Sequence, residues 1–413
     1  MEIKVKYNWP QWPIYSQSVR EELHNVLDSN RWAVSGYWTG EECKEKLFAM
    51  EYAKYNNTKY CVPTTSGTNA LLIALEALGV GYGDEVLVPA LTWLATASVV
   101  LNVNAKPVLV DVDPESYCMD WRKIEELITS KTKAIIPVHL YGSVCDMDEI
   151  MRIAKKHNLY VIEDCAQSHG SEWNGKKVGT IGHLGCFSFQ QAKVLTAGEG
   201  GAVITNDYEV KLRLEQLRAD GRVLADQNEA VKGSLQLIEV GKIQGSNRCL
   251  SEFQAAILIE QLKLLENQND YRQQAAEYLD NELLKIPGIK VQERPISVNK
   301  QTYYSYIIKI DQNEYPFIDA RDVVNKLQEK LVVGDFHIHS PYNAIHKNKL
   351  FCPWLKNRYP EHLSMSEEYW RNQSFPIAEG AIEELVVLHH CMLLSDKELL
   401  DVFIKNFKEI ITL

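Results

Sequence analysis

Between residues 60 and 206, short apolar runs alternate with stretches of helical periodicity, and this alternation restricts the chain to few folds. Several of the runs are continuously apolar, which is typical of strands buried on both faces of a sheet. Strands that alternate with helices predict an α/β fold, in which helices cover both faces of a mostly parallel sheet. The seven predicted strands are the runs 60–65, 85–90, 106–112, 133–140, 159–166, 185–189 and 201–206.

The pattern turns helical after about residue 208. The stretch 252–286 has sustained helical periodicity and contains no internal proline or glycine, which predicts a long helix. Beyond it, a strand pattern (302–310) is followed by a helical pattern (319–331). We therefore expect two domains. They are a large domain of residues 1–265, which holds the seven-stranded sheet, and a smaller α+β domain of residues 266–413.

Charge and composition argue against several classes of partner. The 413 residues carry a net charge of −11, so the chain repels nucleic-acid phosphates over most of its surface. Its first residues lack the apolar core of a signal peptide, and no apolar stretch approaches the ~18 residues that span a bilayer. The nine cysteines form no CxxC pair, and the doublet His389–His390 has no companions at metal-ligand spacing. We expect a cytoplasmic protein without a metal site, a membrane segment or a nucleic-acid partner.

The junction between the first predicted strand and the first helix of this region carries Ser66, Gly67 and Thr68. Free N–H groups, hydroxyl groups and the positive end of a helix dipole make such a junction suitable for binding a phosphate. Ser and Thr are also the usual N-caps of helices, and capping alone explains the pattern equally well.

Two further strand ends carry groups that suit a ligand. Asp164 ends a buried apolar strand, and in open α/β sheets ligands bind beyond the carboxyl ends of the strands. Gln167 follows three residues later and is able to hydrogen-bond the same ligand, although a capping role for Asp164 is the alternative. Trp93 lies beside another strand end, where it either stacks on a planar ligand or packs in the core.

Lys193 lies between the polar segment SFQQ and the glycine-rich segment GEGG. A single lysine is most often a surface residue. A lysine in a partly desolvated site, however, is suited to form a Schiff base with an aldehyde. A phosphate cradle, a strand-end carboxylate and a lysine together match pyridoxal phosphate, which needs all three.

The motifs SGT (66–68), EDCAQ (163–167), SFQQAK (188–193) and GEGG (198–201), with Trp93, resemble those of one family. They are similar to the pyridoxal-phosphate-dependent sugar aminotransferases of the DegT/DnrJ/EryC1/StrS family, which have the type I fold. The resemblance covers essentially the whole chain. A related branch has histidine in place of the lysine and performs dehydration, so Lys193 favours transamination.

The resemblance implies a role for each motif residue. Lys193 is expected to bind the cofactor aldehyde, Asp164 to pair with the ring nitrogen, and Gln167 to contact the phenolic oxygen. Trp93 is expected to stack on the ring. The residues expected to hold the phosphate are Ser66, Gly67, Thr68 and Ser188. The segment 245–257 resembles the part of the family that reaches into a neighbouring subunit, so Asn247 is expected in the phosphate cradle of the partner chain of a homodimer.

Within the family, segments such as RWAVSGYWTG (31–40) and QGSNRCLSEFQ (244–254) resemble the cyclitol branch. This likeness implies L-glutamine as the amino donor and a cyclic ketone, 2-deoxy-scyllo-inosose, as the acceptor, within aminoglycoside antibiotic biosynthesis. Tyr37, Tyr342 and His346 lie in predicted loops, where they either hydrogen-bond the hydroxyl groups of the substrate or pack at an interface.

Three other functions remain open at this point. A nucleotide-diphosphate keto-sugar aminotransferase would need cations near the site, and Arg218, Arg222 and Arg248 are available. A second alternative is an aromatising enzyme similar to 3-amino-5-hydroxybenzoate synthase. A non-catalytic regulator is disfavoured, because the chain is acidic and the first ~30 residues are too short for a helix-turn-helix module.

Overall fold

The computed structural model describes residues 7–225, 231–355 and 365–412. Its largest element is a seven-stranded sheet with the strand order β1-β9-β8-β5-β4-β2-β3. Only β9 runs antiparallel to its neighbours, so the predicted mostly parallel sheet is confirmed, and each predicted run contributes one strand. The strands are β1 (Tyr60–Thr64), β2 (Glu85–Pro89), β3 (Lys106–Val110), β4 (Thr132–Ile135), β5 (Tyr160–Asp164), β8 (Leu184–Ser188) and β9 (Gly201–Thr205).

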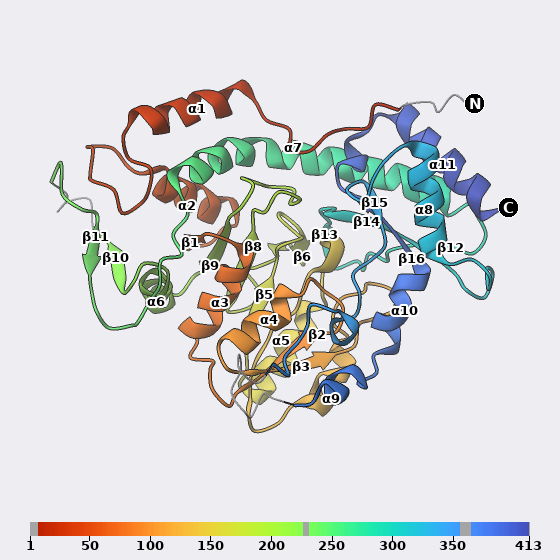
Figure 1. Ribbon diagram of the computed structural model, residues 1–413, viewed down its shortest axis with the longest axis horizontal. Coiled ribbons are helices and arrows are strands. Elements are labelled where there is room, and N and C mark those ends of the chain that lie inside the picture. The colour runs from red at the N-terminus through yellow and green to blue at the C-terminus, as the bar shows by residue number, and fades with distance from the viewer. Residues whose placement is uncertain (1–6, 226–230, 356–364, 413) are drawn as a thin grey trace.

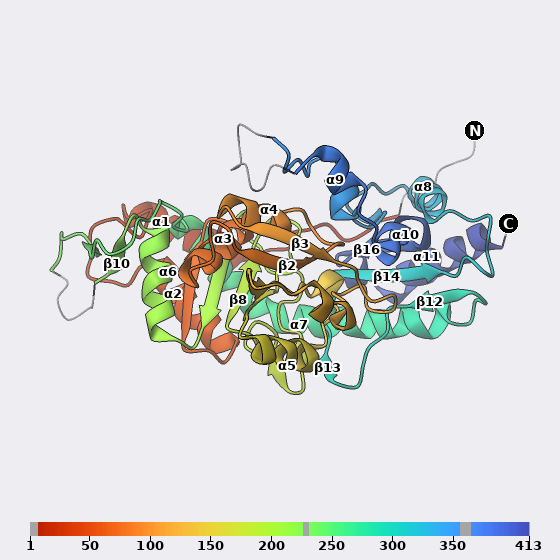
Figure 2. The same ribbon diagram turned by 90° about the horizontal axis from the view of Figure 1, so that it is seen from below.

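Helices cover both faces of this sheet, as the alternating pattern predicts (Figure 2). Helices α3 (Gly67–Ala77) and α4 (Ala95–Asn102) pack on one face, and α5 (Met147–His157) lies on the other. The remaining helices of this part of the chain are α1 (Gln17–Asp28), α2 (Lys44–Tyr55) and α6 (Tyr208–Arg218).

The register of three strands brings distant segments together at one edge of the sheet. Gly201 pairs with Thr64 of β1 on one side and with Ser188 of β8 on the other. Asp164 pairs with Cys186, so the ends of β5 and β8 also meet at this edge. The loops that follow β1, β5 and β8 therefore start side by side.

The C-terminal part of the chain forms a smaller antiparallel sheet with the order β12-β14-β16-β15. Its strands are β12 (Ile289–Val291), β14 (Ser305–Ile310), β16 (Leu385–His389) and β15 (Ile338–His339). Helices α8 (Ala320–Leu331) and α11 (Lys397–Ile411) pack with this sheet around a core of their own. The helices α9 (Glu367–Arg371) and α10 (Pro376–Glu384) precede β16.

A single helix, α7 (Glu252–Leu283), joins the two parts and runs along one side of both (Figure 1). Ser251 begins it with a capping box completed by Gln254. Leu258 and Leu265 pack in the core of the large sheet, whereas Leu279 packs in the core of the small sheet. The predicted domain boundary at 265/266 thus falls inside a continuous helix, where the helix passes from one core to the other.

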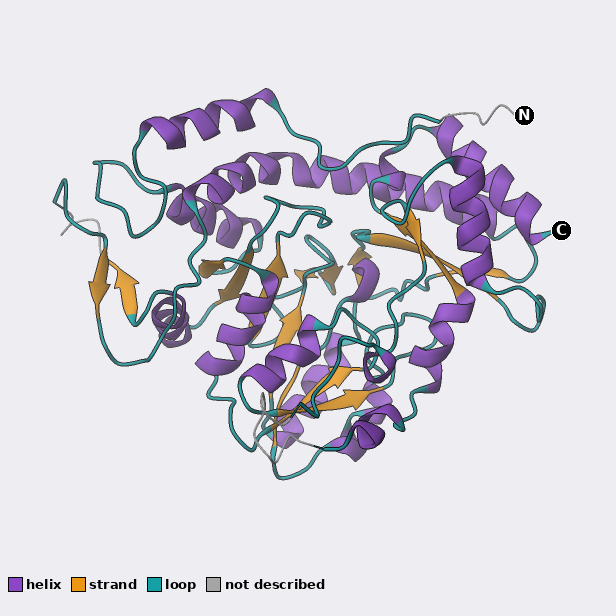
Figure 3. Ribbon diagram, viewed as in Figure 1, coloured by secondary structure: helices purple, strands orange, loops and turns teal. Residues whose placement is uncertain are grey.

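The remaining elements are short (Figure 3). The predicted loop 331–354 is irregular except for β15 and one turn of 3₁₀-helix. Among the described residues, no helix is long and apolar enough to cross a membrane. The short strands are β6 (Glu172–Trp173), β7 (Lys176–Lys177), β10 (Arg222–Leu224), β11 (Leu237–Glu239) and β13 (Val298–Lys300), and the 3₁₀-helices are η1 (Trp121–Lys123), η2 (Glu125–Leu127), η3 (Leu140–Gly142), η5 (Ile345–Lys347) and η7 (Met392–Leu394).

Candidate active site

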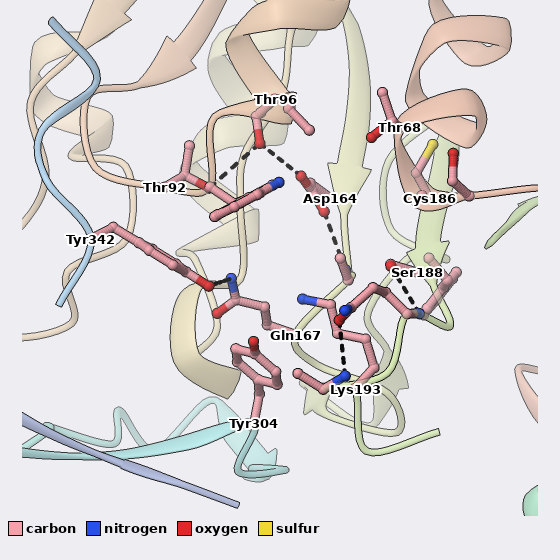
Figure 4. Close-up of a pocket in the computed structure, with 18 of the residues that line it drawn as sticks. Thr68, Thr92, Thr96, Asp164, Gln167, Cys186, Ser188, Lys193, Tyr304 and Tyr342 are labelled. Carbon is pink, nitrogen blue, oxygen red and sulfur yellow. Dashed lines mark hydrogen bonds between the residues drawn. The ribbon is translucent and has the colours of Figure 1, made fainter. Parts of the chain in front are cut away.

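A cavity of about 700 Å³ lies beyond the carboxyl ends of β2, β5 and β8, and the small sheet closes one side of it. This is the edge at which open α/β sheets bind ligands. The structure brings most of the predicted site residues to this one cavity (Figure 4). The predicted residues that line it are Ser66, Gly67, Thr68, Trp93, Asp164, Gln167, Ser188, Lys193 and Tyr342.

Asp164 ends β5 with its side chain buried, and its two oxygens have different partners. The Thr96 hydroxyl donates to Oδ2 at 2.9 Å, and the Ala166 N–H donates to Oδ1 at 3.2 Å. Burial raises the pKa of the Asp164 carboxyl, and these hydrogen bonds and the charge of Lys193 only partly offset it. A buried carboxylate of this kind favours a cationic partner in the cavity, such as a protonated ring nitrogen.

The loop after β1 packs directly against the end of β8. A Cβ atom on Gly67 would lie 2.6 Å from the Ser188 Cβ, and one on Gly201 would lie 2.3 Å from the Ser66 carbonyl oxygen. Only glycine fits at these two positions, because Cβ atoms do not approach other atoms so closely.

The same loop leaves hydrogen-bond donors free at the start of α3. The Ser66 hydroxyl accepts the Asn69 N–H at 3.1 Å, so Ser66 is an N-cap, as the alternative interpretation holds. Gly67 and Thr68 are the first two helical residues, whose N–H groups have no partner within a helix. With the Ser188 hydroxyl, they form a small cradle suited to a phosphate.

Lys193 is buried in the loop that follows β8. Its Nζ lies 4.2 Å from the ring centroid of Tyr304, which comes from the small domain, and its N–H donates to the Gln190 carbonyl at 2.8 Å. The amine therefore sits between the large sheet and the small sheet, in the cavity that also contains Asp164 (Figure 4).

Three aromatic side chains, Trp93, Tyr141 and Tyr342, pack together beside Gln167. The Gln167 Oε1 accepts the Tyr141 N–H at 2.7 Å, and its Nε2 donates to the Tyr342 hydroxyl at 3.4 Å. The Tyr342 ring stacks on Tyr141 with centroids 5.7 Å apart and lies 5.9 Å from the Trp93 ring. Trp93 is 55% exposed, so it is not a core residue and its ring is free to contact a ligand.

Three predicted residues lie outside this cavity. His346 is buried against Phe375, and its Nε2 lies 3.1 Å from a Glu379 oxygen, so it packs against α10 and does not line the cavity. Tyr37 is 65% exposed and pairs by its backbone with Leu235, beside the β10–β11 hairpin.

Asn247 is also exposed, in a segment that touches the phosphate cradle from outside. The backbone of Asn247 bridges to Ala219, and the next residue, Arg248, accepts the Thr65 N–H on its carbonyl at 3.0 Å. Asn247 does not line the cavity of its own chain. Its expected role in the site of a second subunit stays a prediction.

Several residues of the cavity are not predictable from local sequence patterns. Thr96 lies three residues beyond Trp93, in the first turn of α4, and Tyr304 was part of a run interpreted only as a strand. The small domain contributes further side chains whose place follows from domain packing and not from a local motif. They are Asp335, Phe336, His339 and His389.

The donor set of the cavity fits pyridoxal phosphate. The cradle offers the Gly67 and Thr68 N–H groups and the Ser188 hydroxyl, and it leaves no room for a Cβ atom at Gly67. Asp164 and Lys193 line the same cavity from adjacent strand ends, and both are buried. Asp164, Gln167 and Lys193 would thus contact the ring nitrogen, the phenolic oxygen and the aldehyde.

Comparison with known proteins agrees with this geometry. The chain is 43% identical over 394 residues to the L-glutamine:2-deoxy-scyllo-inosose aminotransferase of Streptoalloteichus tenebrarius, covering 94% of this chain and 91% of that protein. It is 40% identical over 404 residues to the L-glutamine:scyllo-inosose aminotransferase of Streptomyces griseus, covering 98% and 94%. The crystal structure of 3-amino-5-hydroxybenzoic acid synthase superposes with a TM-score of 0.85 at 28% identity, covering 99% of this chain and all of that one.

The sequence profile of the DegT/DnrJ/EryC1/StrS aminotransferase family matches residues 15–405, nearly the whole chain. The match and the fold indicate the same family. The chain belongs to the DegT/DnrJ/EryC1/StrS aminotransferase family, and it is a pyridoxal-phosphate-dependent aminotransferase.

Proposed function

We propose that this enzyme transfers the amino group of L-glutamine to 2-deoxy-scyllo-inosose and forms 2-deoxy-scyllo-inosamine, a step of aminoglycoside antibiotic biosynthesis. The observation that carries the chemistry is the placing of Lys193 and Asp164 in one buried cavity. The choice of donor and acceptor is supported by the 43% identity to the Streptoalloteichus enzyme over 94% of the chain.

The chain's own residues supply binding and proton transfer. Bound pyridoxal phosphate supplies an electron-withdrawing ring that takes up the electron pair of the donor Cα–H bond. The Lys193 amine, once the donor amine has displaced it, would be placed to accept the proton from the donor Cα and to return it to the cofactor carbon on the other side of the transferred nitrogen. The Asp164 carboxylate keeps the proton on the ring nitrogen, and its burial strengthens this pairing.

The other cavity residues orient the reacting groups. The Gly67 and Thr68 N–H groups and the Ser188 hydroxyl would hold the phosphate, and Trp93 would cover one face of the ring. The Tyr342 hydroxyl, held by Gln167, is placed to hydrogen-bond a hydroxyl group of the acceptor. Fixed positions of this kind lower the barrier because the reactants need no further ordering.

The charges around the cavity favour a neutral cyclitol over a nucleotide-diphosphate sugar. Among the described residues that line the cavity, Lys193 is the only lysine or arginine. The three arginines considered for a diphosphate are each paired with a carboxylate. The pairs are Arg218 with Glu45, Arg222 with Asp220, and Arg248 with Glu76.

We further propose a cytoplasmic homodimer with shared sites. Several large apolar side chains are exposed near the segment that carries Asn247 and beside the β10–β11 hairpin, which suits an interface between copies. They include Trp32, Tyr37, Leu235 and Ile238. In such a dimer, Asn247 and Tyr37 would complete the partner's site.

The visible absorption spectrum of the purified protein tests the proposal. A band of lysine-bound cofactor that bleaches on addition of L-glutamine would establish the first half of the reaction. Restoration of the band by 2-deoxy-scyllo-inosose, and not by a nucleotide-diphosphate keto sugar, would identify the acceptor. A band that never forms, even with added pyridoxal phosphate, would refute the assignment of Lys193.

Formation of an aromatic amine, followed by ultraviolet absorption, would favour instead an activity like that of 3-amino-5-hydroxybenzoic acid synthase, the structural neighbour at 28% identity. Scyllo-inosose belongs in the same panel of ketones, because the Streptomyces griseus relative is named for it.

A further inference from the structure

The backbone N–H groups of Lys193 and of the two residues before it are all hydrogen-bonded within the large domain. In residues 190–193, here called the lysine loop, the Gln191 N–H donates to the Gly198 carbonyl at 2.8 Å. The Ala192 N–H donates to Gln190 Oε1 at 2.9 Å, and the Lys193 N–H donates to the Gln190 carbonyl at 2.8 Å. These bonds come from within the large domain, and they leave the carbonyls of Gln191 and Ala192 to other partners.

The Ala192 carbonyl accepts two hydrogen bonds from the small domain. His389, the last residue of β16, and His390 each place Nε2 at 3.1 Å from this oxygen. The Cys391 N–H donates to His389 Nδ1 at 3.3 Å, so the proton of His389 is on Nε2, where it donates to Ala192. Both lone pairs of one carbonyl are thus used by side chains from another domain.

The Gln191 carbonyl accepts a third bond from the N-terminal segment. The Trp12 Nε1–H donates to it at 3.0 Å, and the Trp12 ring meets the His390 ring edge-on with centroids 4.5 Å apart. The guanidinium carbon of Arg272, on α7, lies 5.3 Å from the Trp12 ring centroid. Two separate parts of the chain, the N-terminal segment and the end of β16, therefore converge on two consecutive carbonyls of the lysine loop.

We propose that His389, His390 and Trp12 are positioning residues for the proposed transamination, which hold the Lys193 amine at the cofactor aldehyde by fixing the two carbonyls before it. This role rests on the proposed function. It also gives the histidine doublet, which showed no metal-ligand pattern, a place in the site.

The electrostatics of the two histidines suit this role. Burial lowers the pKa of His389 to about 3 and that of His390 well below its usual value. Both rings are therefore neutral near pH 7, so each offers one N–H without placing a second positive charge beside the lysine. The backbone N–H of His390 donates to the Tyr304 carbonyl at 3.2 Å. Tyr304, whose ring lies over the Lys193 amine, is therefore fixed to the histidine pair.

Paired substitutions of the histidines test the proposal. His389→Phe and His390→Phe keep a ring but remove the N–H donor, whereas His389→Gln and His390→Gln keep a donor near the Nε2 position. We expect the double Phe variant to bind pyridoxal phosphate roughly tenfold more weakly, from titration of the visible band, since a buried carbonyl loses both partners. We also expect the double Phe variant to shift the pH at which the visible band changes. The Gln variants should recover most of the affinity and most of the original pH of this change.

A control separates positioning from general stability. His183 accepts the Val161 N–H on its Nδ1 at 3.0 Å, at the far end of β5, so His183→Phe also removes a bond between a histidine and the backbone. It is expected to lower the thermal midpoint without changing the affinity or the pH of the spectral change. The proposal would be overturned if His183→Phe changed the affinity and the pH of the spectral change as much as the double Phe variant does. It would also be overturned if the variants of His389 and His390 changed neither quantity.

Two further results keep the test decisive. Failure of the wild-type protein to bind pyridoxal phosphate would refute the proposed function and not merely the positioning role. If the Phe variants do not fold, nitrogen-15 spectra of histidine-labelled wild-type protein decide instead. Two neutral, Nε2-protonated rings that persist down to about pH 5 support the proposal. Charged or Nδ1-protonated rings at positions 389 and 390 would contradict it.

Discussion

Replacing Thr96 with valine isolates the hydrogen bond that the Thr96 hydroxyl donates to Asp164 Oδ2 at 2.9 Å. Valine has nearly the shape of threonine and the site is buried, so the packing is retained while the donor is lost. A hydrogen bond to a charged group contributes about 1.5–3 kcal/mol. At 1.36 kcal/mol for each factor of ten, we expect roughly 10- to 100-fold slower bleaching by L-glutamine at pH 7.

The same substitution has a defined effect on the pH dependence. Burial already raises the pKa of Asp164, and the Thr96 hydroxyl opposes this by stabilising the ionised form. Removing the hydroxyl raises the pKa further. Because the ionised carboxylate holds the proton on the ring nitrogen, activity should be lost at a higher pH as the solution is acidified.

Stopped-flow measurement of the first half-reaction between about pH 5 and 9 follows both quantities. The matched control is Thr92→Val, because the Thr92 hydroxyl, which also lines the cavity, is hydrogen-bonded to Thr96 at 3.4 Å and not to Asp164. A much smaller change is expected there. If Thr96→Val lost activity at the same acidic pH as the wild-type protein and reacted at an unchanged rate, the role given to this hydroxyl would be refuted.

Four further changes address the lysine, the cradle, the substrate side of the cavity and the histidine that lies outside it. Lys193→Ala should bring turnover below detection while the protein still folds, and substantial transamination by this variant would rule out the assignment. Gly67→Ala places a Cβ atom 2.6 Å from the Ser188 Cβ and should weaken cofactor binding about tenfold or more, measured by spectral titration; an unchanged affinity would argue against the cradle. Tyr342→Phe should raise the KM for the ketone severalfold without changing thermal stability. His346→Phe should leave the KM unchanged and cost about 0.5–1.5 kcal/mol of unfolding free energy in denaturant, because it removes one of the two contacts of a Glu379 oxygen, which keeps the Phe375 N–H. A raised KM in this variant would restore His346 as a substrate contact.

The sequence was most informative where local pattern and position in the sheet coincide. The seven strands could be predicted because each is a short apolar run between helical segments, and once the sheet is parallel its carboxyl ends define the site. Asp164, Ser66 and Ser188 lie at such ends or in the loop just beyond them, so their convergence follows from topology. The lysine follows from its glycine-rich neighbours and the resemblance to the family.

The rest of the site depends on tertiary packing that no local pattern contains. Thr96 reaches Asp164 only because α4 packs on the sheet, and Tyr304 and His389 arrive from a second domain. His346 was misplaced because loop composition does not reveal which way a side chain points. Asn247 is exposed on the single chain, so its expected role depends on a second copy.

The continuous helix α7 has a mechanical consequence. At 1.5 Å per residue, its 32 residues form a rod roughly 48 Å long, with no proline or glycine at which it would kink. One half of the rod is embedded in the core of the large sheet and the other half in that of the small sheet. A hinge motion between the domains would have to bend this rod, so we expect the two walls of the cavity to keep a nearly constant spacing. We therefore expect acceptors to be selected by the size and shape of this opening, so that a ketone too wide for it is excluded before it reaches Lys193.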